Sequence, residues 1–411
     1  MARPHEGTEQ RSSGRLTGRT VALCVTGSVA AYKAAVLARL LVKEGASVVP
    51  VMTESATKFI GGATLSGLTG NAALGAAEMW STPGELHVQL GSTADAVVVA
   101  PASADVLARL AQGRADDLVT ALVLCAKGPV LVAPAMHPRM WTHPATQKNV
   151  EGLRAQGRVM VVGPAVGPVA SGDQGPGRMI EPEAILEAIV FAVTPKDLKG
   201  VRVVVSAGPT LEDLDPVRFL SNRSSGKMGF AIAARGAARG AEVTLVAGPV
   251  QLPTPHGVLR VDVRTALEMQ AALAQARASC DAVVMAAAVA DYRPAATSGT
   301  KIKKKGEQTT LELVQNPDLL AEMGMARTGP RPVLVGFALE TGTRQAIVAE
   351  ARRKLREKKV DVVVANEART AFGGDDNEIT FVTENREERL PRASKVDLAD
   401  ALLDRIKSLL G

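Results

Sequence analysis

Aromatic residues are scarce in this sequence. Only 3% of its 411 residues are aromatic: seven Phe, two Trp and two Tyr. Proteins that bind single-stranded nucleic acids stack bases on exposed rings, and the strands of all-β proteins are enriched in aromatic residues. The sequence therefore argues against both classes. Because 46% of the residues are hydrophobic, we expect a core of Val, Ala and Leu, as in α/β folds with buried parallel strands.

Cysteines and long apolar runs are also lacking. The three cysteines, Cys24, Cys125 and Cys280, are widely spaced and form no CxxC motif. We therefore expect a reducing, cytoplasmic location without a disulfide framework or a zinc site. No apolar run approaches the roughly 20 residues of a membrane-spanning helix, which predicts no membrane partner. Residues 1–18 contain Arg, Ser and Gly but no apolar segment, which predicts a disordered tail rather than a signal peptide.

The charge balance is slightly basic, with 48 Lys and Arg against 42 Asp and Glu and a formal net charge of +6. A basic surplus can serve a nucleic acid, but it suits a polyphosphate ligand equally well. Because the rings that stack on bases are scarce, we expect no nucleic-acid partner.

The sequence does contain two series of β–α units. From residue 20, short apolar runs that end in Gly, Ser or Pro alternate with helical segments, and the pattern restarts after the segment 194–200. Strands that alternate with helices indicate parallel sheets covered on both faces. We therefore predict an α/β protein with two consecutive Rossmann-like domains and mainly parallel sheets. After the tail, the expected domains are residues 19–195 and 196–411.

The first predicted strand of the first half is followed by a Gly-Ser turn that opens a helix, in TGSVAAYK. The N–H groups of such a turn can bind a phosphate, and Ser28 adds a hydroxyl, although such turns more often have no ligand. The motif contains one glycine rather than GxGxxG, and the second strand ends in Thr53 rather than an acidic residue. This pattern favours a mononucleotide over a dinucleotide such as NAD.

A longer series of motifs covers residues 20–190: GSVAAYK, VMTESATKF, LHVQL, APASADVLARLAQGRADDL, PAMHPRMW and GDQGPGRM. This series resembles the flavin-dependent cysteine decarboxylases, in particular those that act on phosphopantothenoylcysteine. The resemblance implies bound FMN, with Ser28, Thr53 and Ser103 near its phosphate or ring. It also implies a flavin site shared between subunits, and therefore at least a trimer.

The resemblance further implies catalytic and substrate-binding positions. His87, in GELHVQL, matches the family's base; a lone histidine is more often structural, but imidazole transfers protons readily near neutral pH. Met136 and His137 lie in the substrate-binding loop, which usually reads PAMN in the family and PAMH here. Ser171 stands where the family usually has a cysteine that donates the final proton. A serine hydroxyl is a far weaker acid than a thiol, but it could relay a proton from water or from Asp173.

The second half carries a long motif, SAGPTLEDLDPVRFLSNRSSGKMG. It places a Gly-Pro-Thr loop, Asn222 and small polar residues ahead of a helix, where backbone N–H groups can hold a phosphate or carboxylate. The spacing of a P-loop is absent, and composition alone does not exclude a polar loop without a ligand. Asp291 follows a later strand, and the basic run KIKKK begins at Lys301. Such runs are usually solvated, but this position suits a triphosphate with Mg²⁺.

With NPDLL, GFALET and KLREKKVDVVVAN, residues 197–405 resemble the phosphopantothenate–cysteine ligases. The resemblance implies CTP as co-substrate, Mg²⁺ held by Asp291, and a catalytic role for Lys301. It also implies that Asn222 handles an acyl-cytidylate. The implied CTP contacts are Met285, Ala286, Ala287, Asp291, Lys301, Pro317, Asp318, Leu319, Leu320, Phe337, Lys354 and Lys358.

Together the two halves resemble the fused bifunctional enzymes of bacterial coenzyme A biosynthesis. The resemblance implies a C-terminal half that condenses 4′-phosphopantothenate with L-cysteine using CTP, and an N-terminal half that decarboxylates the product to 4′-phosphopantetheine using FMN. It also implies trimeric N-terminal and dimeric C-terminal contacts, which would together give a dodecamer. One alternative is an active ligase fused to a flavin-binding domain with impaired or altered decarboxylation, because Ser171 and His137 replace the usual Cys and Asn. A flavin-binding regulatory protein remains a further alternative for the first half, and an NAD-dependent dehydrogenase is disfavoured.

Overall fold

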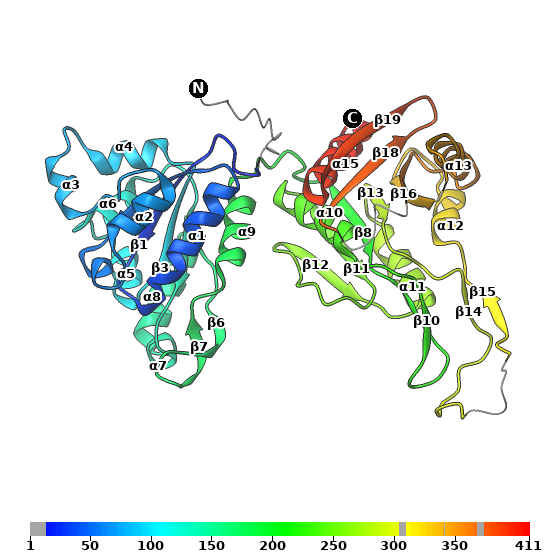
Figure 1. Ribbon diagram of the computed structural model, residues 1–411, viewed down its shortest axis with the longest axis horizontal. Helices are drawn as coiled ribbons and strands as arrows, with labels where there is room; N and C mark the ends of the chain where they lie inside the picture. The colour runs from blue at the N-terminus through cyan, green and yellow to red at the C-terminus, as the bar shows by residue number, and fades with distance from the viewer. Residues whose placement is uncertain (1–13, 304–309, 341, 368–373) are drawn as a thin grey trace, which may run out of the picture. The chain divides into compact units, whose positions relative to one another are not determined.

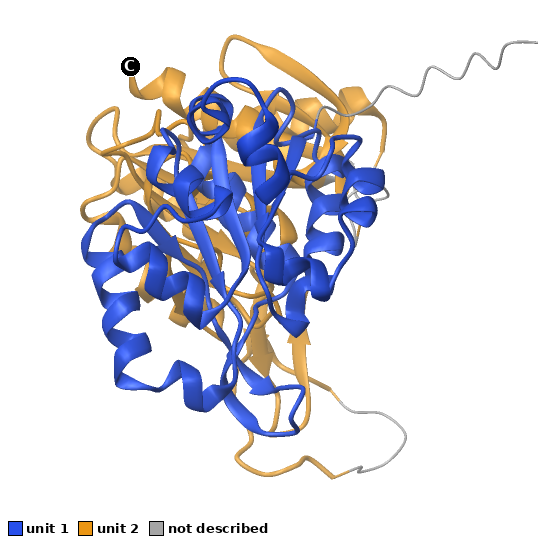
Figure 2. Ribbon diagram, turned by 90° about the vertical axis from the view of Figure 1, so that its left-hand side faces the viewer, with its two compact units in different colours: residues 1–194 blue, residues 195–411 orange. Residues whose placement is uncertain are grey.

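The computed structural model describes residues 14–303, 310–340, 342–367 and 374–411. The chain divides into two compact units, residues 1–194 and residues 195–411 (Figure 2). Each unit is built around its own sheet, with helices packed against the strands (Figure 1). None of the described helices has the length and apolarity needed to cross a membrane.

The first described residues belong to the folded part of the first unit. Leu16 is completely buried in the core, and the Arg15 guanidinium forms ion pairs with Glu44 and Glu187 at 2.9 and 2.7 Å. The prediction of a disordered tail is therefore wrong for residues 14–18, because Leu16 is packed and Arg15 anchors the segment. Residues 1–13 lie outside the described residues.

The sheet of the first unit has five parallel strands. They are β1 (Thr20–Val25), β2 (Ser47–Met52), β3 (Ala96–Ala102), β4 (Val130–Pro134) and β5 (Val159–Val161). Their order in the sheet is β2-β1-β3-β4-β5. Strands β3 and β4 are buried along their whole length, as expected for Val-rich and Ala-rich strands covered on both faces.

Helices cover both faces of this sheet. The helical elements are η1 (Val29–Ala31), α1 (Tyr32–Lys43), η2 (Glu54–Lys58), α2 (Gly62–Thr69), α3 (Ala76–Ser81), α4 (Leu86–Thr93), α5 (Ala104–Ala111), α6 (Leu118–Cys125), α7 (Pro138–Trp141), α8 (Pro144–Ala155) and α9 (Pro182–Val193). Helices α1, α2 and α9 pack on the face that carries Leu23, and α5, α6 and α8 pack on the face that carries Cys24. The alternation follows from the two-residue period of a strand.

An antiparallel hairpin lies outside the sheet of the first unit. It consists of β6 (Ala165–Pro168) and β7 (Gln174–Arg178). We call residues 165–178 the flap. In Figure 1 the flap lies beside α7, and α7 contacts β7.

The second unit has an eight-stranded sheet. Its strands are β8 (Arg202–Ala207), β11 (Glu242–Ala247), β12 (Val258–Asp262), β13 (Ala282–Met285), β16 (Val333–Glu340), β17 (Val362–Glu367), β18 (Asp376–Val382) and β19 (Glu387–Ser394). Their order is β12-β11-β8-β13-β16-β17-β18-β19. The first six strands are parallel, and β18 and β19 are antiparallel.

Smaller elements complete this unit. Two short antiparallel pairs join β9 (Leu211–Asp213) to β10 (Phe219–Ser221) and β14 (Tyr292–Pro294) to β15 (Leu313–Gln315). The helices are α10 (Lys227–Ala238), α11 (Ala266–Arg277), α12 (Leu319–Ala326), α13 (Arg344–Glu357) and α15 (Lys395–Leu410).

In both sheets the first strand lies inside the sheet. The next strand or strands along the chain are added on one side of it, and the later strands on its other side. The strand order therefore reverses between β1 and β3 in the first unit and between β8 and β13 in the second. The first order is that of flavodoxin-like folds, and the six parallel strands of the second unit have the Rossmann order; ligands of both bind at the carboxyl ends of the strands beside the reversal. The predicted fold class is confirmed.

Candidate active sites

Three hydroxyl side chains lie at the carboxyl ends of adjacent strands in the first unit. Ser28, Thr53 and Ser103 follow β1, β2 and β3, respectively. Each caps the helical element that comes next: Ser28 Oγ accepts from Ala30 N, Thr53 Oγ1 from Ala56 N and Ser103 Oγ from Val106 N, each at 3.3 Å. The fold thus brings all three predicted residues to one edge of the sheet.

Close packing shapes this edge at the point of reversal. Thr26 Oγ1 donates to the Pro101 carbonyl at 2.7 Å and accepts from the Ser103 N–H at 3.2 Å, which joins the ends of β1 and β3. A Cβ on Gly27 would lie 2.6 Å from Ser55 Oγ, so the loops after β1 and β2 meet only because Gly27 has no side chain. The hydroxyls and helix N-termini present there fit the phosphate of a mononucleotide.

The loop that carries Met136 and His137 is joined to the flap by a hydrogen bond. His137 Nδ1 accepts from the Arg139 N–H at 3.2 Å, so in a neutral ring the proton is on Nε2. His137 Nε2 then donates to Asp173 Oδ2 at 2.6 Å, and Ser171 Oγ donates to the same oxygen at 3.3 Å. The hydrogen bond from His137 is the main cause that lowers the pKa of Asp173 below its usual value. His137 and Ser171 therefore share one carboxylate oxygen.

Glycines allow the base of the flap to lie against this loop. The Met136 N–H donates to the Gly177 carbonyl at 2.9 Å. A Cβ on Gly177 would clash with the Met136 carbonyl, and a Cβ on Gly175 would lie 2.9 Å from Pro138 Cβ. Side chains at these two flap positions would push the flap away from the loop.

Lys33 is a structural anchor that the sequence analysis missed. Its side chain is only 8% exposed, and Nζ donates to the Met179 carbonyl at 3.2 Å and to Glu181 at 3.0 Å. These two hydrogen bonds connect the start of α1, close to Ser28 in the sequence, to the residues that follow the flap. A signal in the sequence could have indicated this role. Lys33 lies next to Ala34 and one turn before Leu37, and therefore on the buried face of the helix.

His87 lies on α4 and is half-buried. Among the described residues, the His87 side chain has no hydrogen-bond partner, and this includes the other predicted site residues. Its role as a base stays a prediction.

In the second unit, the loops after β8 and β13 are interlocked. The Ala288 N–H donates to the Gly208 carbonyl at 2.9 Å. The Ala287 N–H donates to Ser206 Oγ at 3.2 Å, and the Ala290 N–H donates to Thr210 Oγ1 at 3.0 Å. These bonds bring Met285, Ala286 and Ala287 to the point of reversal in the sheet.

Helix α10 begins at the same edge. A Cβ on Gly229 would lie 2.5 Å from Ala207 Cβ, so only a glycine allows the helix this close to the end of β8. Upstream of the helix, the Asn222 side chain donates from Nδ2 to the Val289 carbonyl at 2.9 Å. The fold thus joins the motif that carries Asn222 to the loop after β13.

Asn316 is a second residue that the sequence analysis missed, although it begins the NPDLL motif. It is only 6% exposed. Its N–H donates to the Asp291 carbonyl at 2.8 Å, and its Nδ2 donates to the Ala290 carbonyl at 2.9 Å. Its Oδ1 accepts from Arg293 at 3.0 Å. Asn316 therefore holds the backbone that presents Asp291.

The Asp291 side chain itself is exposed. Within the described ranges no group of three or more His, Cys, Asp or Glu residues is arranged to hold a metal ion. Mg²⁺ is commonly bound through one or two carboxylates together with substrate phosphates. A single carboxylate at the sheet edge fits a Mg²⁺ ion that arrives with a nucleotide.

The beginning of the basic run is held by a buried carboxylate. Asp215 accepts from the Ile302 N–H at 3.0 Å and from Arg218 at 2.6 Å, and Arg218 also donates to the Ile302 carbonyl at 3.0 Å. The Arg218 guanidinium is the main cause that lowers the pKa of Asp215 far below its usual value. Lys301 is exposed beside this anchor. Lys304 and Lys305 of the run lie outside the described residues.

The remaining predicted nucleotide contacts gather around α12. Asp318 caps this helix and forms an ion pair with Lys358 at 2.8 Å. Leu320 packs closely on Gly336, next to Phe337 on β16. Pro317 precedes Asp318, and Lys354 lies on α13 one turn before Lys358. The Leu319 side chain is buried in the core, so Leu319 can offer a nucleotide only its backbone.

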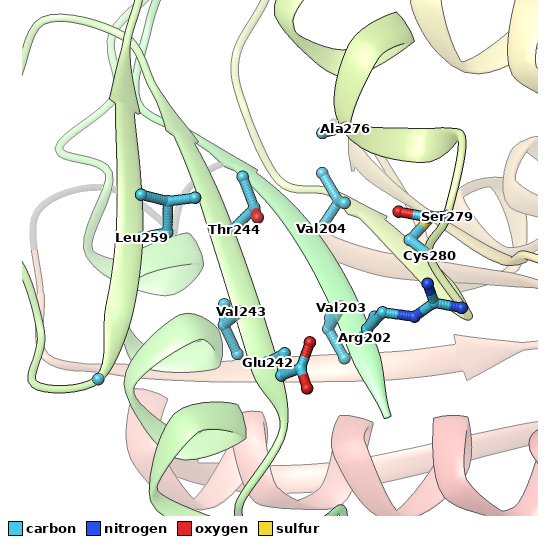
Figure 3. Close-up of a pocket in the computed structure, with 11 residues that line it drawn as sticks. Arg202, Val203, Val204, Glu242, Val243, Thr244, Leu259, Ala276, Ser279 and Cys280 are labelled. Carbon is cyan, nitrogen blue, oxygen red and sulfur yellow. The ribbon is translucent and has the colours of Figure 1, made fainter. Parts of the chain in front are cut away.

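A surface groove in the second unit lies at the other end of the strands. Its lining includes Arg202 and Glu242, which are the first residues of β8 and β11, together with Thr244, Leu259 and Cys280 (Figure 3). The predicted nucleotide contacts lie at the carboxyl ends of the strands or beside α12. The groove therefore contains none of the predicted site residues.

Comparisons with known proteins match each half of the chain to a known family. Residues 9–194 match the Flavoprotein family, and residues 198–410 match the family described as DNA/pantothenate metabolism flavoprotein C-terminal domain. The coenzyme A biosynthesis bifunctional protein CoaBC of Vibrio cholerae is 43% identical over 394 residues, which is 94% of this chain and 98% of that protein. The CoaBC protein of Escherichia coli is also 43% identical, over 95% of this chain and 97% of its own.

A crystal structure of the C-terminal domain of a CoaBC protein is 36% identical, with a TM-score of 0.45, and covers 52% of this chain and 98% of that chain. The motifs, the two family matches and the near full-length relatives lead to one assignment. The chain belongs to the family of bifunctional coenzyme A biosynthesis proteins, which combine a decarboxylase part with a ligase part.

Proposed function

We propose that the two parts catalyse consecutive steps. In the ligase domain, residues 196–411, 4′-phosphopantothenate is joined to L-cysteine with CTP. In the decarboxylase domain, residues 19–195, the product is converted to 4′-phosphopantetheine with FMN. One observation carries the proposal: in each unit, motif residues lie at the carboxyl ends of the two strands between which the strand order reverses. Ser28 and Ser103 follow β1 and β3, and the loops after β8 and β13 are joined by hydrogen bonds. Such folds bind nucleotides at this position.

In the first unit, Ser28, Thr53 and Ser103 would hold FMN. When bound, FMN supplies the oxidation of the cysteinyl side chain that makes loss of CO₂ possible. His87 is the proposed base, and Met136 and His137 bind the substrate. The glycine-packed contact between the flap and the loop around His137 would exclude water from the substrate.

Ser171 is the proposed donor of the final proton. Its hydroxyl already donates to the Asp173 carboxylate at 3.3 Å, and a hydroxyl bound to an anion is a weaker acid still. This observation favours a second candidate for the first unit, in which CO₂ is released but the last reduction is slow. The two candidates differ in their product, because the second accumulates an oxidised enethiol.

In the second unit, the chemistry requires activation of a carboxylate. An amide forms from a carboxylate only after a leaving group has been attached, and CTP would supply one as an acyl-CMP with release of pyrophosphate. Lys301 and Lys358 place positive charge near the phosphates, and Asp291 would hold Mg²⁺ together with them. Asn222, tied to the loop after β13, would position the acyl-cytidylate for attack by the amine of cysteine.

The assembly is also part of the proposal. We expect a cytoplasmic homo-oligomer with trimeric contacts of the first unit and dimeric contacts of the second, which together make a dodecamer. Light scattering on the purified protein measures the subunit number directly. A monomer would contradict the shared flavin site.

A coupled assay tests the proposed function. The purified protein should be yellow, and with cysteine and 4′-phosphopantothenate it should release pyrophosphate from CTP in preference to ATP. CO₂ release, followed separately, should require the ligase product and FMN. Pyrophosphate without CO₂ would leave only the ligase, and CO₂ with an oxidised product would support the second candidate.

A further inference from the structure

The hydrogen-bonding capacity of the His137 ring is fully used in this structure. Nδ1 accepts from the Arg139 N–H at 3.2 Å, and Nε2 donates to Asp173 Oδ2 at 2.6 Å. A substrate group that binds the Nε2 proton must therefore displace Asp173. The contact joins the substrate-binding loop to the flap, between residues that are 36 positions apart in the chain.

The surroundings of Asp173 Oδ2 are those of a carboxylate-binding site. Besides His137, the Ser171 hydroxyl donates to this oxygen at 3.3 Å. The Arg139 guanidinium lies 3.9 Å from it and is 86% exposed, so it is free to follow a different anion. An imidazole N–H, a hydroxyl and a guanidinium thus surround a single carboxylate oxygen, and the carboxylate belongs to the protein itself.

We propose that Asp173 is a built-in substitute for the carboxylate of the decarboxylation substrate. In the free protein it occupies the donor on His137, and the carboxylate of the incoming substrate replaces it. This inference rests on the proposed decarboxylase function and adds a competitor that the function by itself does not require.

The exchange has a physical rationale. Exchange of one carboxylate for another keeps the Nε2 donor of His137 paired with a charged acceptor and leaves the charge at this position balanced. After CO₂ has left, the product no longer carries a carboxylate, and Asp173 returns to His137. The flap therefore distinguishes substrate from product by the group that the reaction removes.

Binding of two unreactive analogues tests the proposal. 4′-Phosphopantothenoyl-serine keeps the carboxylate but has no thiol to oxidise, and the matching ethanolamide lacks the carboxylate. With Asp173→Ala, the FMN-loaded protein should bind the serine analogue about tenfold more tightly by calorimetry, the size of one hydrogen bond to a charged group. Its affinity for the ethanolamide should not change. Asp173→Asn, which keeps an acceptor without charge, should give a smaller gain.

Gln174→Ala is the matched control. Gln174 is the next residue on the flap, and its side chain has no hydrogen bond within the described part of the chain, so this variant should bind both analogues as the wild type does. Hydrogen exchange of the flap adds a readout that is independent of turnover. Without ligand, exchange in residues 165–178 should be faster in Asp173→Ala than in the control.

The outcomes separate this inference from the proposed function. Weaker or unchanged binding of the serine analogue to Asp173→Ala would overturn the exchange, as would an equal gain for both analogues. Failure of the wild-type protein to release CO₂ from 4′-phosphopantothenoyl-cysteine would instead refute the decarboxylase function.

Discussion

Replacement of Gly229 by alanine should separate helix α10 from strand β8 and impair the second unit alone. The new Cβ would lie 2.5 Å from Ala207 Cβ and 3.0 Å from the Ser206 carbonyl oxygen. Both neighbours are fixed parts of a buried strand, so the helix must move rather than a side chain. The same stretch of β8 supports the loop after β13, because Ser206 Oγ accepts from the Ala287 N–H.

The magnitude follows from the contact distances. Carbon atoms in van der Waals contact are about 3.5–4.0 Å apart, so the helix and the strand must separate by about 1 Å. Overpacking of this kind typically costs about 1–3 kcal/mol. Exchange of glycine for alanine within a helix recovers up to about 1 kcal/mol. We expect a net loss of about 0–2 kcal/mol in the free energy of unfolding. The ligase rate should be lower by about a hundredfold, because catalysis is sensitive to displacements of this size.

Two other glycine-to-alanine variants serve as controls. In Gly236→Ala on the same helix, the nearest atoms are the flexible Val243 Cγ2 at 3.2 Å and Leu403 Cδ2 at 3.8 Å, so the change should be nearly neutral. In Gly152→Ala on α8, no atom lies within 4 Å of the new Cβ, and the variant should gain stability. Thermal unfolding by circular dichroism and pyrophosphate release from CTP give the two measurements, and the flavin absorbance monitors the first unit.

One combined result would refute the reasoning. This result is a Gly229→Ala variant that unfolds at the temperature of the wild type or above it and that also keeps its ligase rate. In that case the close approach of α10 to β8 does not determine the geometry of the proposed ligase site. Loss of flavin together with ligase activity would show that the damage is not confined to the second unit.

Three further variants test other parts of the structure. Lys301→Gln should strongly lower pyrophosphate release while FMN binding stays intact, and an equal loss of both would contradict the division into two domains. Ser171→Cys should speed the final reduction, seen by chromatography as less oxidised enethiol per CO₂; an unchanged product ratio would exclude Ser171 as the limiting donor. Lys33→Met should loosen the chain after the flap, measured as faster hydrogen exchange there. Lys33 lowers the pKa of Glu181 below its ordinary 4.5. The ion pair therefore stabilises the folded chain at higher pH, and this stabilisation is lost as the pH falls through the lowered pKa. The difference in exchange between wild type and Lys33→Met should therefore narrow in acid, and a pH-independent difference would contradict the ion pair.

The edge of each sheet that carries the proposed nucleotide site could be predicted from the sequence, because it depends on local patterns. A strand of buried Val and Ala followed by a polar residue places that residue at a carboxyl end, whatever the rest of the fold. Ser28, Thr53 and Ser103 were found in this way, whereas Met285, Ala286 and Ala287 were assigned only through the family resemblance. Lys33 and Asn316 were missed because each bonds to backbone carbonyls, and periodicity carries no information about carbonyls elsewhere in the fold.

The sequence by itself determined the two α/β units, the strand ends that carry polar residues, and the family. These properties follow from the two-residue period of strands, the helical period and the motifs, all of which lie within short stretches of chain. The tertiary structure decided which side chains meet: Asp173 with His137, Glu181 with Lys33, and Asp215 with Ile302, at separations of 36, 148 and 87 residues. It also showed that Leu16 belongs to the core and not to a tail. Such pairings depend on strand order and loop packing, and these are set only when the whole sheet has formed.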